Sequence, residues 1–262
     1  MIGSASYLFS HFRLMFRVVR NEWRTQYAGS SLGILWTLLK PWMLLSLYSV
    51  IYVFIFRIRA EGMTTPQYVL YVFSGLIPFF MTAESLSQGV GSVTSSKAVI
   101  ENKIFPVDLV PPKAIFIGQS PMIAGMPVVI IGSLWMGSGS WTMLALPVLW
   151  CFHILALMGI LWIMSLINVV FRDLQNFVQI MLITLLIASP FSYTPDMVPA
   201  RLQPIIALNP FAYFVMAYQG ILVRGHLPPI FNCIFILVFS LGLFFLGSKF
   251  FSRAKRVIID YV

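Results

Sequence analysis

The stretch AIFIGQSPMIAGMPVVIIGSLWMGSGSWTMLALPVLWCFHILALMGILWIMSLINVVF, residues 114–171, decides the fold, because it contains no Asp, Glu, Lys or Arg. One helix needs about 20 apolar residues to cross the hydrocarbon of a bilayer, so this stretch is long enough for two crossings. Its middle is the sequence GSGS, residues 137–140, between Trp135 and Trp141. Small turn residues between two aromatic residues are typical of a short connection at a membrane surface. The stretch therefore predicts a hairpin of two transmembrane helices.

The composition of the whole chain agrees with a membrane protein. Of its 262 residues, 59% are hydrophobic and 10% are charged, and the mean hydropathy is +0.90. Soluble domains carry about 25% charged residues. These values exclude a disordered chain, an ordinary nucleic-acid-binding domain and a soluble enzyme. The net charge of +9 is first a topology signal, because Lys and Arg gather on the cytoplasmic side of membranes. We therefore expect an all-α polytopic membrane protein.

Charged residues mark the ends of the apolar segments and predict six transmembrane helices, at residues 32–56, 66–88, 112–136, 141–170, 175–195 and 227–249. Both ends of the chain are basic, which favours two cytoplasmic termini and an even number of crossings. Segment 202–223 is also long enough to cross, but a seventh crossing would place one basic end outside. We therefore predict two short re-entrant helices there, on the outer side and broken near Asn209-Pro210. Broken backbone persists at membrane depth only where protein buries it or where it lines a cavity.

Residues 4–26 predict an amphipathic helix that lies in the membrane interface. Aromatic and aliphatic residues recur on one stripe, and arginines repeat the same spacing one residue later, at Arg13, Arg17, Arg20 and Arg24. A surface anchor is one sufficient interpretation. The other interpretation adds the capture of an anionic, lipid-linked substrate. Lys40 lies about 8 residues into the first predicted span. It either extends to the cytoplasmic surface or faces a pathway and meets a phosphate.

Two predicted cytoplasmic connections carry charges that a partner protein could contact. Residues 95–106 are the longer connection, and their Lys97, Glu101 and Lys103 have the spacing of a short solvated helix. This segment is either a solvated loop or a coupling helix that docks into a soluble subunit. The shorter connection contains Arg172 and Asp173, which either mark a membrane boundary or anchor the same partner.

The sequence contains none of the catalytic motifs for which we searched. It contains no Walker motif, no Gly-x-Ser-x-Gly elbow and no His-Glu-x-x-His pair. The three histidines are far apart in the chain, and His153 is expected to be an ordinary core residue. We therefore predict no catalytic residue, no metal site and no cofactor in this chain. One further pattern concerns packing: Gly118, Gly125 and Gly132 recur every seven residues, which lets two helices approach closely.

Several short motifs resemble, in order, the type-2 ABC exporter permeases that move polysaccharides. The first is YAGSSLGILW at residues 27–36, followed by Pro41. The others are FSGLIPFF at residues 73–80, ENKIFP at residues 101–106, FRDL at residues 171–174, and then Ser189-Pro190 and Asn209-Pro210. The resemblance covers roughly residues 20–223, and the FRDL loop is most similar to that of O-antigen exporters.

The resemblance implies a single transmembrane domain over residues 1–262, in the cell inner membrane, that forms a homodimer. It implies two copies of a separate ATPase subunit, which bind ATP and Mg. The implied substrate is a glycan on undecaprenyl diphosphate, which the exporter moves from cytoplasm to periplasm. The other implied partners are membrane lipids, and no nucleic acid is expected to bind. Periplasmic gate helices would include Pro204, Asn209, Pro210 and Tyr213.

Other functions remain open at this point. Within the same family they are capsule or teichoic-acid export and drug or small-lipid export. Outside it they are a lipid-linked sugar transferase, which needs clustered acidic or His residues, and a secondary carrier, which needs intramembrane charges.

Overall fold

The computed structural model describes residues 4–55, 62–97, 105–193 and 197–259, and within these ranges the chain is helical and contains no strand. The α-helices are α1 (Ser4–Ser10), α2 (Phe12–Thr25), α3 (Trp36–Ser49), α4 (Thr65–Val90), α5 (Ser92–Ser95), α7 (Val110–Ile117), α8 (Ser120–Trp135), α9 (Leu146–Val170), α10 (Leu174–Ala188), α11 (Gln203–Leu208), α12 (Pro210–Gln219) and α13 (Ile230–Ile259). Short helical turns are Gly33–Leu35, Val50–Ile55, Val107–Leu109, Trp141–Ala145 and Gly220–Arg224. The predicted all-α class is confirmed.

Among the described residues, five helical segments are long and apolar enough to cross a membrane. They are Gly33–Tyr52, Thr65–Val90, Val107–Trp135, Trp141–Val170 and Ile230–Lys255. The predicted hairpin is present, and Gly137 at its turn has a φ of +72°, which a residue without a Cβ adopts easily. α10 corresponds to the predicted span 175–195 but has only 15 residues, about 22 Å of helix. Its length alone therefore does not make it a membrane crossing.

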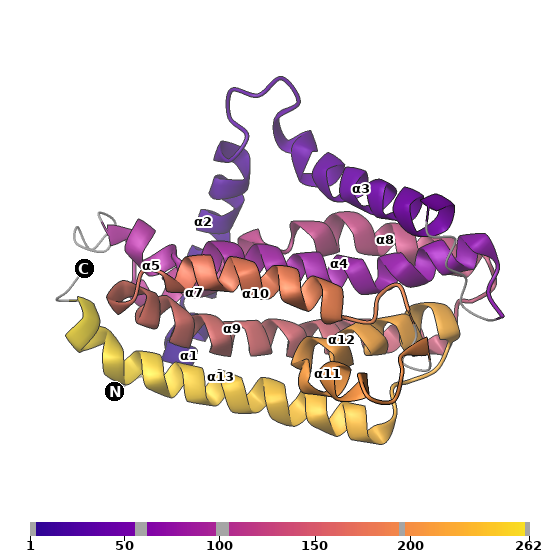
Figure 1. The fold of residues 1–262 in the computed structure, drawn as a ribbon. Coiled ribbons are helices and arrows are strands. Elements are labelled where there is room, and N and C mark those ends of the chain that lie inside the picture. The colour runs from indigo at the N-terminus through magenta and orange to yellow at the C-terminus, as the bar shows by residue number, and fades with distance from the viewer. Residues whose placement is uncertain (1–3, 56–61, 98–104, 194–196, 260–262) are drawn as a thin grey trace.

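The long helices α4, α8, α9, α10 and α13 run side by side, and α2 crosses them steeply at one end (Figure 1). α4 is the central helix, since it contacts α3, α7, α8, α9, α10 and α12. Both ends of the chain lie at the end of the bundle that α2 crosses, whereas α11 and α12 lie at the opposite end (Figure 1). The predicted interface segment 4–26 is two helices, α1 and α2, with a break at His11.

The glycine repeat predicted to pack closely does so against α4 of the same chain. A Cβ on Gly118 would lie 2.7 Å from the backbone nitrogen of Ser85, and Cβ atoms on Gly125 and Gly132 would lie 2.8 Å from Ile77 and Leu70. The three contacts follow α4 in reverse order, so the two helices are antiparallel. Near Gly118 the predicted third span is also divided into α7 and α8.

α9 and α13 approach each other even more closely, with backbone against backbone. A Cβ on Gly159 would collide with the carbonyl group of Leu243, and a Cβ on Gly247 would collide with the carbonyl oxygen of Gly159. Without a hydrophobic force between helices in lipid, such van der Waals contact is a main source of helix association. The position of α13, and with it the C-terminal end of the chain, therefore depends on these two glycines.

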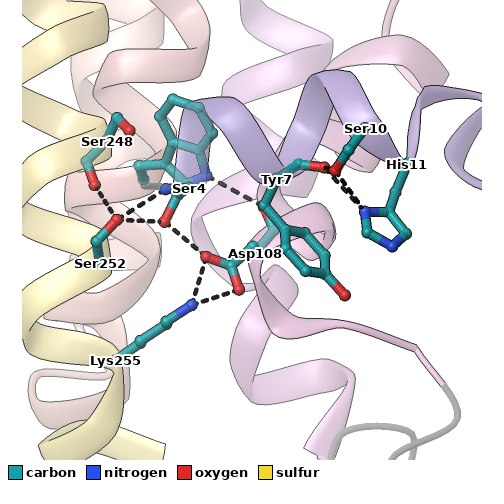
Figure 2. A network of polar contacts seen from close by, with 9 residues as sticks. Ser4, Tyr7, Ser10, His11, Asp108, Ser248, Ser252 and Lys255 are labelled. Atoms are coloured by element: carbon teal, nitrogen blue, oxygen red, sulfur yellow. Dashed lines mark hydrogen bonds and ion pairs between the residues drawn. The ribbon is translucent and has the colours of Figure 1, made fainter. Parts of the chain in front are cut away.

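A buried carboxylate, that of Asp108, joins three segments of the chain through polar contacts (Figure 2). Asp108 is 5% exposed and accepts hydrogen bonds from Ser4 Oγ at 2.6 Å and from Lys255 Nζ at 2.6 and 2.7 Å. Ser252 Oγ lies 2.8 Å from Ser4 Oγ, and Trp162 Nε1 donates to the Asp108 carbonyl oxygen at 3.2 Å. We name these residues the Asp108 cluster. It ties α1, the turn Val107–Leu109 and α13 together.

Replacing Gly159 by Ala is expected to lower the thermal unfolding midpoint of the purified protein in detergent. The new methyl group would meet backbone atoms of α13 that cannot rotate away, and such overpacking costs about 1–3 kcal/mol. Gly242→Ala is the matched control, because a Cβ at Gly242 has open space around it and Ala favours a helix over Gly by up to about 1 kcal/mol. Equal unfolding midpoints for the two variants would contradict the proposed contact between α9 and α13.

Candidate functional site

A groove of about 270 Å³ opens between α3, α4, α8 and α10, and charged residues lie inside it. Lys40 of α3 and Glu84 of α4 both line it, and both belong to segments apolar enough to span a membrane. An ionisable residue in a membrane-spanning helix costs free energy, so its presence indicates a functional site. The charged partner of Lys40 is Glu84. We call this space the Lys40–Glu84 groove.

The polar side chains that line the groove form two separate sets of contacts, the first of which includes the neighbouring Gln88. Lys40 Nζ lies 3.3 Å from Glu84 Oε2, and Gln88 Nε2 donates to Glu84 Oε1 at 2.6 Å. Gln179 of α10 donates to Ser87 Oγ at 2.7 Å. The Lys40 side chain is 53% exposed and the Glu84 side chain 26%, so the pair is open to a ligand on one side. A cation held beside hydrogen-bonding groups in this way can bind an anion or sugar hydroxyl groups.

Aromatic rings continue the groove along α3. The ring of Tyr48 lies 5.7 Å from that of Phe80 and 6.4 Å from that of Phe191, and the ring of Tyr52 lies 6.0 Å from that of Phe191. Phe80 also lines the Lys40–Glu84 groove. Tyr48 is two helical turns beyond Lys40, about 12 Å. The surface therefore changes from charged to aromatic along one helix, and a ring offers an apolar face together with, in Tyr, a hydroxyl group.

The arginines of α2 form an exposed stripe next to the bundle. Arg13, Arg17, Arg20 and Arg24 are all exposed. α2 is held in place by the ion pair of Glu22 with Lys113, at 2.5 Å, and by the hydrogen bond from Trp23 Nε1 to the Ile117 carbonyl oxygen, at 3.1 Å. The stripe is therefore fixed against α7 and free to meet an anion.

The residues predicted to contact a partner lie partly outside the described ranges. Glu101 and Lys103 belong to the gap at residues 98–104, and Lys97 immediately precedes it. Arg172 and Asp173 are exposed in the turn between α9 and α10. Asn168 Nδ2 donates to Thr94 Oγ1 at 3.4 Å, so the end of α9 that leads into this turn lies beside α5. The described start of the longer connection thus lies at the same end of the bundle as the turn with Arg172 and Asp173.

The predicted gate residues lie at the other end, around the junction of α11 and α12. Asn209 accepts a hydrogen bond from the Phe211 backbone nitrogen at 3.0 Å and donates to Ser189 Oγ at 2.9 Å, so it begins α12 and ties it to the end of α10. Pro204 lies in the first turn of α11 and Pro210 in the first turn of α12. Tyr213 stacks on Phe235 of α13, with ring centroids 4.1 Å apart.

From the sequence we singled out Lys40 but did not pair it with Glu84. A signal was available, because Lys40 lies early in the first span and Glu84 late in the second, and consecutive antiparallel helices bring such positions to one level. No sequence signal singled out Tyr48, Tyr52 and Phe191 among the many rings of this chain. In the part of the chain that the structure describes, no group of three or more His, Cys, Asp or Glu could hold a metal ion. His153 is buried and its Nε2 lies 2.9 Å from Thr82 Oγ1, as expected of a core residue.

Comparisons with known proteins identify relatives that align with almost the whole chain. An O-antigen export system permease protein, RfbA, of Klebsiella pneumoniae is 26% identical over 248 residues, which cover 93% of each chain. A protein of the same name from Myxococcus xanthus is 24% identical over 259 residues, which cover 98% of each chain. The polysialic acid transport protein KpsM of Escherichia coli is 20% identical over 242 residues, which cover 91% of this chain and 92% of its own.

A family model agrees with these relatives. The model of the ABC-2 type transporter matches residues 13–223, a region that begins at the arginine stripe and includes the Lys40–Glu84 groove, the turn at Arg172 and the helices α11 and α12. The resemblance seen in the short motifs is confirmed, and the chain belongs to the ABC-2 type transporter family.

Proposed function

We propose that this chain is the membrane-spanning subunit of an ATP-driven exporter of polysaccharide, with O-antigen as its substrate. The observation that carries the proposal is the end-to-end similarity to two O-antigen export permeases. The Lys40–Glu84 groove and the rings beyond it support it, because a glycan needs a surface that offers both hydrogen bonds and apolar faces. ATP is hydrolysed by a separate subunit, as is general in this family, and this chain supplies the path.

The topology in this proposal has six crossings and two cytoplasmic termini in the cell inner membrane. α10 would be the fifth crossing, completed by the non-helical residues 189–192, which are buried. Gln219 Nε2 donates to the carbonyl oxygens of Pro190 and Phe191, each at 3.1 Å. Irregular backbone is tolerated at membrane depth when protein satisfies it in this manner. Basic residues at both chain ends and their position at one end of the bundle (Figure 1) support the same topology.

In the proposed mechanism two copies of the chain enclose the path of the glycan. The exposed arginines of α2 attract the diphosphate of an undecaprenyl-linked substrate, since Arg binds phosphate through two parallel hydrogen bonds. Lys40 receives the same anion or the first sugars within the bilayer. The glycan then moves along the rings of Tyr48 and Tyr52 from the cytoplasmic to the periplasmic side. Ring surfaces tolerate sliding because they fix no single hydrogen-bonding position.

ATP binding on the partner subunit is transmitted through the end of the bundle where the turn between α9 and α10 lies. Lys97, Glu101 and Lys103 of the segment 95–106 would dock into the ATPase, together with Arg172 and Asp173. At the opposite end α11 and α12 are the re-entrant gate, which includes Pro204, Pro210 and Tyr213. Asn209 lies at the break between the two helices and begins α12. The tie from Asn209 to Ser189 would let the gate move with α10, which lines the groove.

Capsular polysaccharide export is the second candidate. The similarity to a polysialic acid transport protein over 91% of this chain favours it, although the identity is lower than to the O-antigen permeases.

Deleting the gene in its host is the direct test of the proposed substrate. The expected result is loss of the O-antigen ladder from lipopolysaccharide, with accumulation of lipid-linked glycan inside the cell, and restoration by a plasmid copy. Loss of capsule with an intact ladder would replace the first candidate by the second. An unchanged surface glycan of both kinds would refute polysaccharide export.

Replacing Arg13, Arg17, Arg20 and Arg24 together by Gln should reduce glycan export by about tenfold or more while the protein still inserts. A lost charge-assisted hydrogen bond weakens binding by about 1.5–3 kcal/mol, and about 1.4 kcal/mol corresponds to a factor of ten. The measurement is surface glycan at matched levels of membrane-inserted protein. Lys249→Gln with Arg253→Gln is the control, because these exposed residues are basic but lie on α13. Full export by the quadruple variant would reject the role in substrate capture.

Arg172→Glu should reduce the amount of ATPase subunit that co-purifies with this chain by about tenfold. A reversed charge in a protein interface repels its former partner and costs a few kcal/mol. Arg201→Glu is the matched control, because Arg201 is also exposed but precedes α11, at the opposite end of the bundle. If both variants bind the ATPase equally well, the turn between α9 and α10 is not a docking point.

A further inference from the structure

A second groove, of about 440 Å³, lies between α1 and α2 on one side and α7, α8 and α9 on the other. Its walls include Phe12 and Phe16 of α2, Phe116 of α7, and Trp150 and Cys151 of α9. We name it the α2 groove. It shares no lining residue with the Lys40–Glu84 groove, and α8 separates the two, because Ser120 and Pro121 line one while Gln119 and Ile123 line the other.

The polar atoms of the α2 groove are already engaged by the protein. Trp23 Nε1 donates to the Ile117 carbonyl oxygen at 3.1 Å, and Trp150 Nε1 donates to Gln119 Oε1 at 2.7 Å. The amide nitrogen of Gln119 donates in turn to the Ile115 carbonyl oxygen at 2.9 Å. What remains for an occupant is hydrocarbon surface. The groove therefore fits an apolar chain and offers little to a sugar or a peptide.

The protein leaves part of this hydrocarbon surface uncovered. On α2, Met15 is 0% and Val19 is 1% exposed, whereas Phe12 is 46% and Phe16 is 53% exposed. Phe9 of α1, which also lines the groove, is 69% exposed. On a helix that lies in a membrane interface, apolar side chains exposed in this way meet the acyl chains of lipids.

The arginine stripe adjoins the α2 groove residue by residue. Phe12, Phe16, Val19 and Trp23 all line the groove, and each is followed directly by an arginine, at positions 13, 17, 20 and 24. Successive residues of a helix are about 100° apart, since one turn takes 3.6 residues. A row of exposed cations thus borders an apolar groove along its length, and this arrangement complements a molecule with an anionic head and an apolar chain.

We propose that the α2 groove is a binding site for an anionic phospholipid, with one acyl chain in the groove and the phosphate against the arginine stripe. The lipid is resident and not cargo, because α8 separates the α2 groove from the Lys40–Glu84 groove, along which we propose that the glycan moves. One phosphodiester engages only part of a stripe of four arginines, so a diphosphate can still bind there. Phospholipid binding requires only that the chain lies in a membrane, whereas the distinction between resident lipid and cargo rests on the proposed export function.

The test uses the complex of this chain with its ATPase subunit, purified in detergent, and measures the bound phospholipid by mass spectrometry. The wild-type complex should retain phosphatidylglycerol, and Cys151→Trp should reduce the amount retained about tenfold. The new indole ring would occupy part of the α2 groove, and keeping as few as two methylene groups of the acyl chain out of the groove weakens binding by about that factor. Cys233→Trp is the matched control, since Cys233 is also an exposed cysteine but lies on α13 and outside the groove. Equal retention by both variants overturns the proposal.

A second measurement compares two lipids on the wild-type complex, and its main result does not depend on a variant. Phosphatidylglycerol added to the delipidated wild-type complex should raise its thermal unfolding midpoint more than phosphatidylcholine does, and the Gln replacements of the arginine stripe should abolish the difference. An equal effect of the two lipids overturns the proposal. Recovery of a polyprenyl diphosphate in place of phospholipid also overturns it, while leaving the proposed export function intact.

Discussion

The close approach of neighbouring helices to α4 sets the position of the other elements. Three glycines on α7 and α8 allow that approach, and their contacts descend α4 from Ser85 to Leu70. In a bilayer, helix association gains little from the hydrophobic effect, so contact area between backbones becomes decisive. Because these contacts fix the position of α4 along α8, they also fix where Phe80 and Glu84 of α4 lie in the groove beside α3 and α10. The groove is therefore a consequence of how the core packs.

The charges of the groove have an energetic reason to be paired. An unpaired ionised side chain on an apolar helix costs free energy in a membrane, and the contact of Lys40 with Glu84 lowers that cost while both side chains keep access to the groove. A ligand anion would compete with Glu84 for Lys40, and Gln88 would then hold the released carboxylate. After such an exchange Glu84 would keep only the neutral amide of Gln88 as a partner, so the return of Lys40 to Glu84 would favour release of the anion.

Much of the fold could be predicted from charge-free segments, because the length of hydrocarbon that a helix must cross is fixed. The hairpin at residues 137–140, the break at Asn209 and the packing of Gly118, Gly125 and Gly132 all followed from local patterns. The break at His11 and the short α10 did not, because they depend on what neighbouring helices cover. For the site, the sequence named Lys40 but not its contact with Glu84, and it could not select Tyr48 and Tyr52. These are tertiary contacts between α3 and its neighbours, and a single sequence carries no direct record of them.

The Asp108 cluster has a consequence for how the chain is made. Asp108 is synthesised 147 residues before Lys255, the cation that it binds. Until the last helix emerges from the ribosome and enters the bilayer, the carboxylate lacks this counter-ion and cannot be enclosed at low energy. The Asp108 cluster can therefore form only after α13 has inserted and packed against the other helices. A chain in which α13 is missing or misplaced would keep Asp108 without its cation, and this unpaired carboxylate would oppose packing of the turn Val107–Leu109 against the other helices.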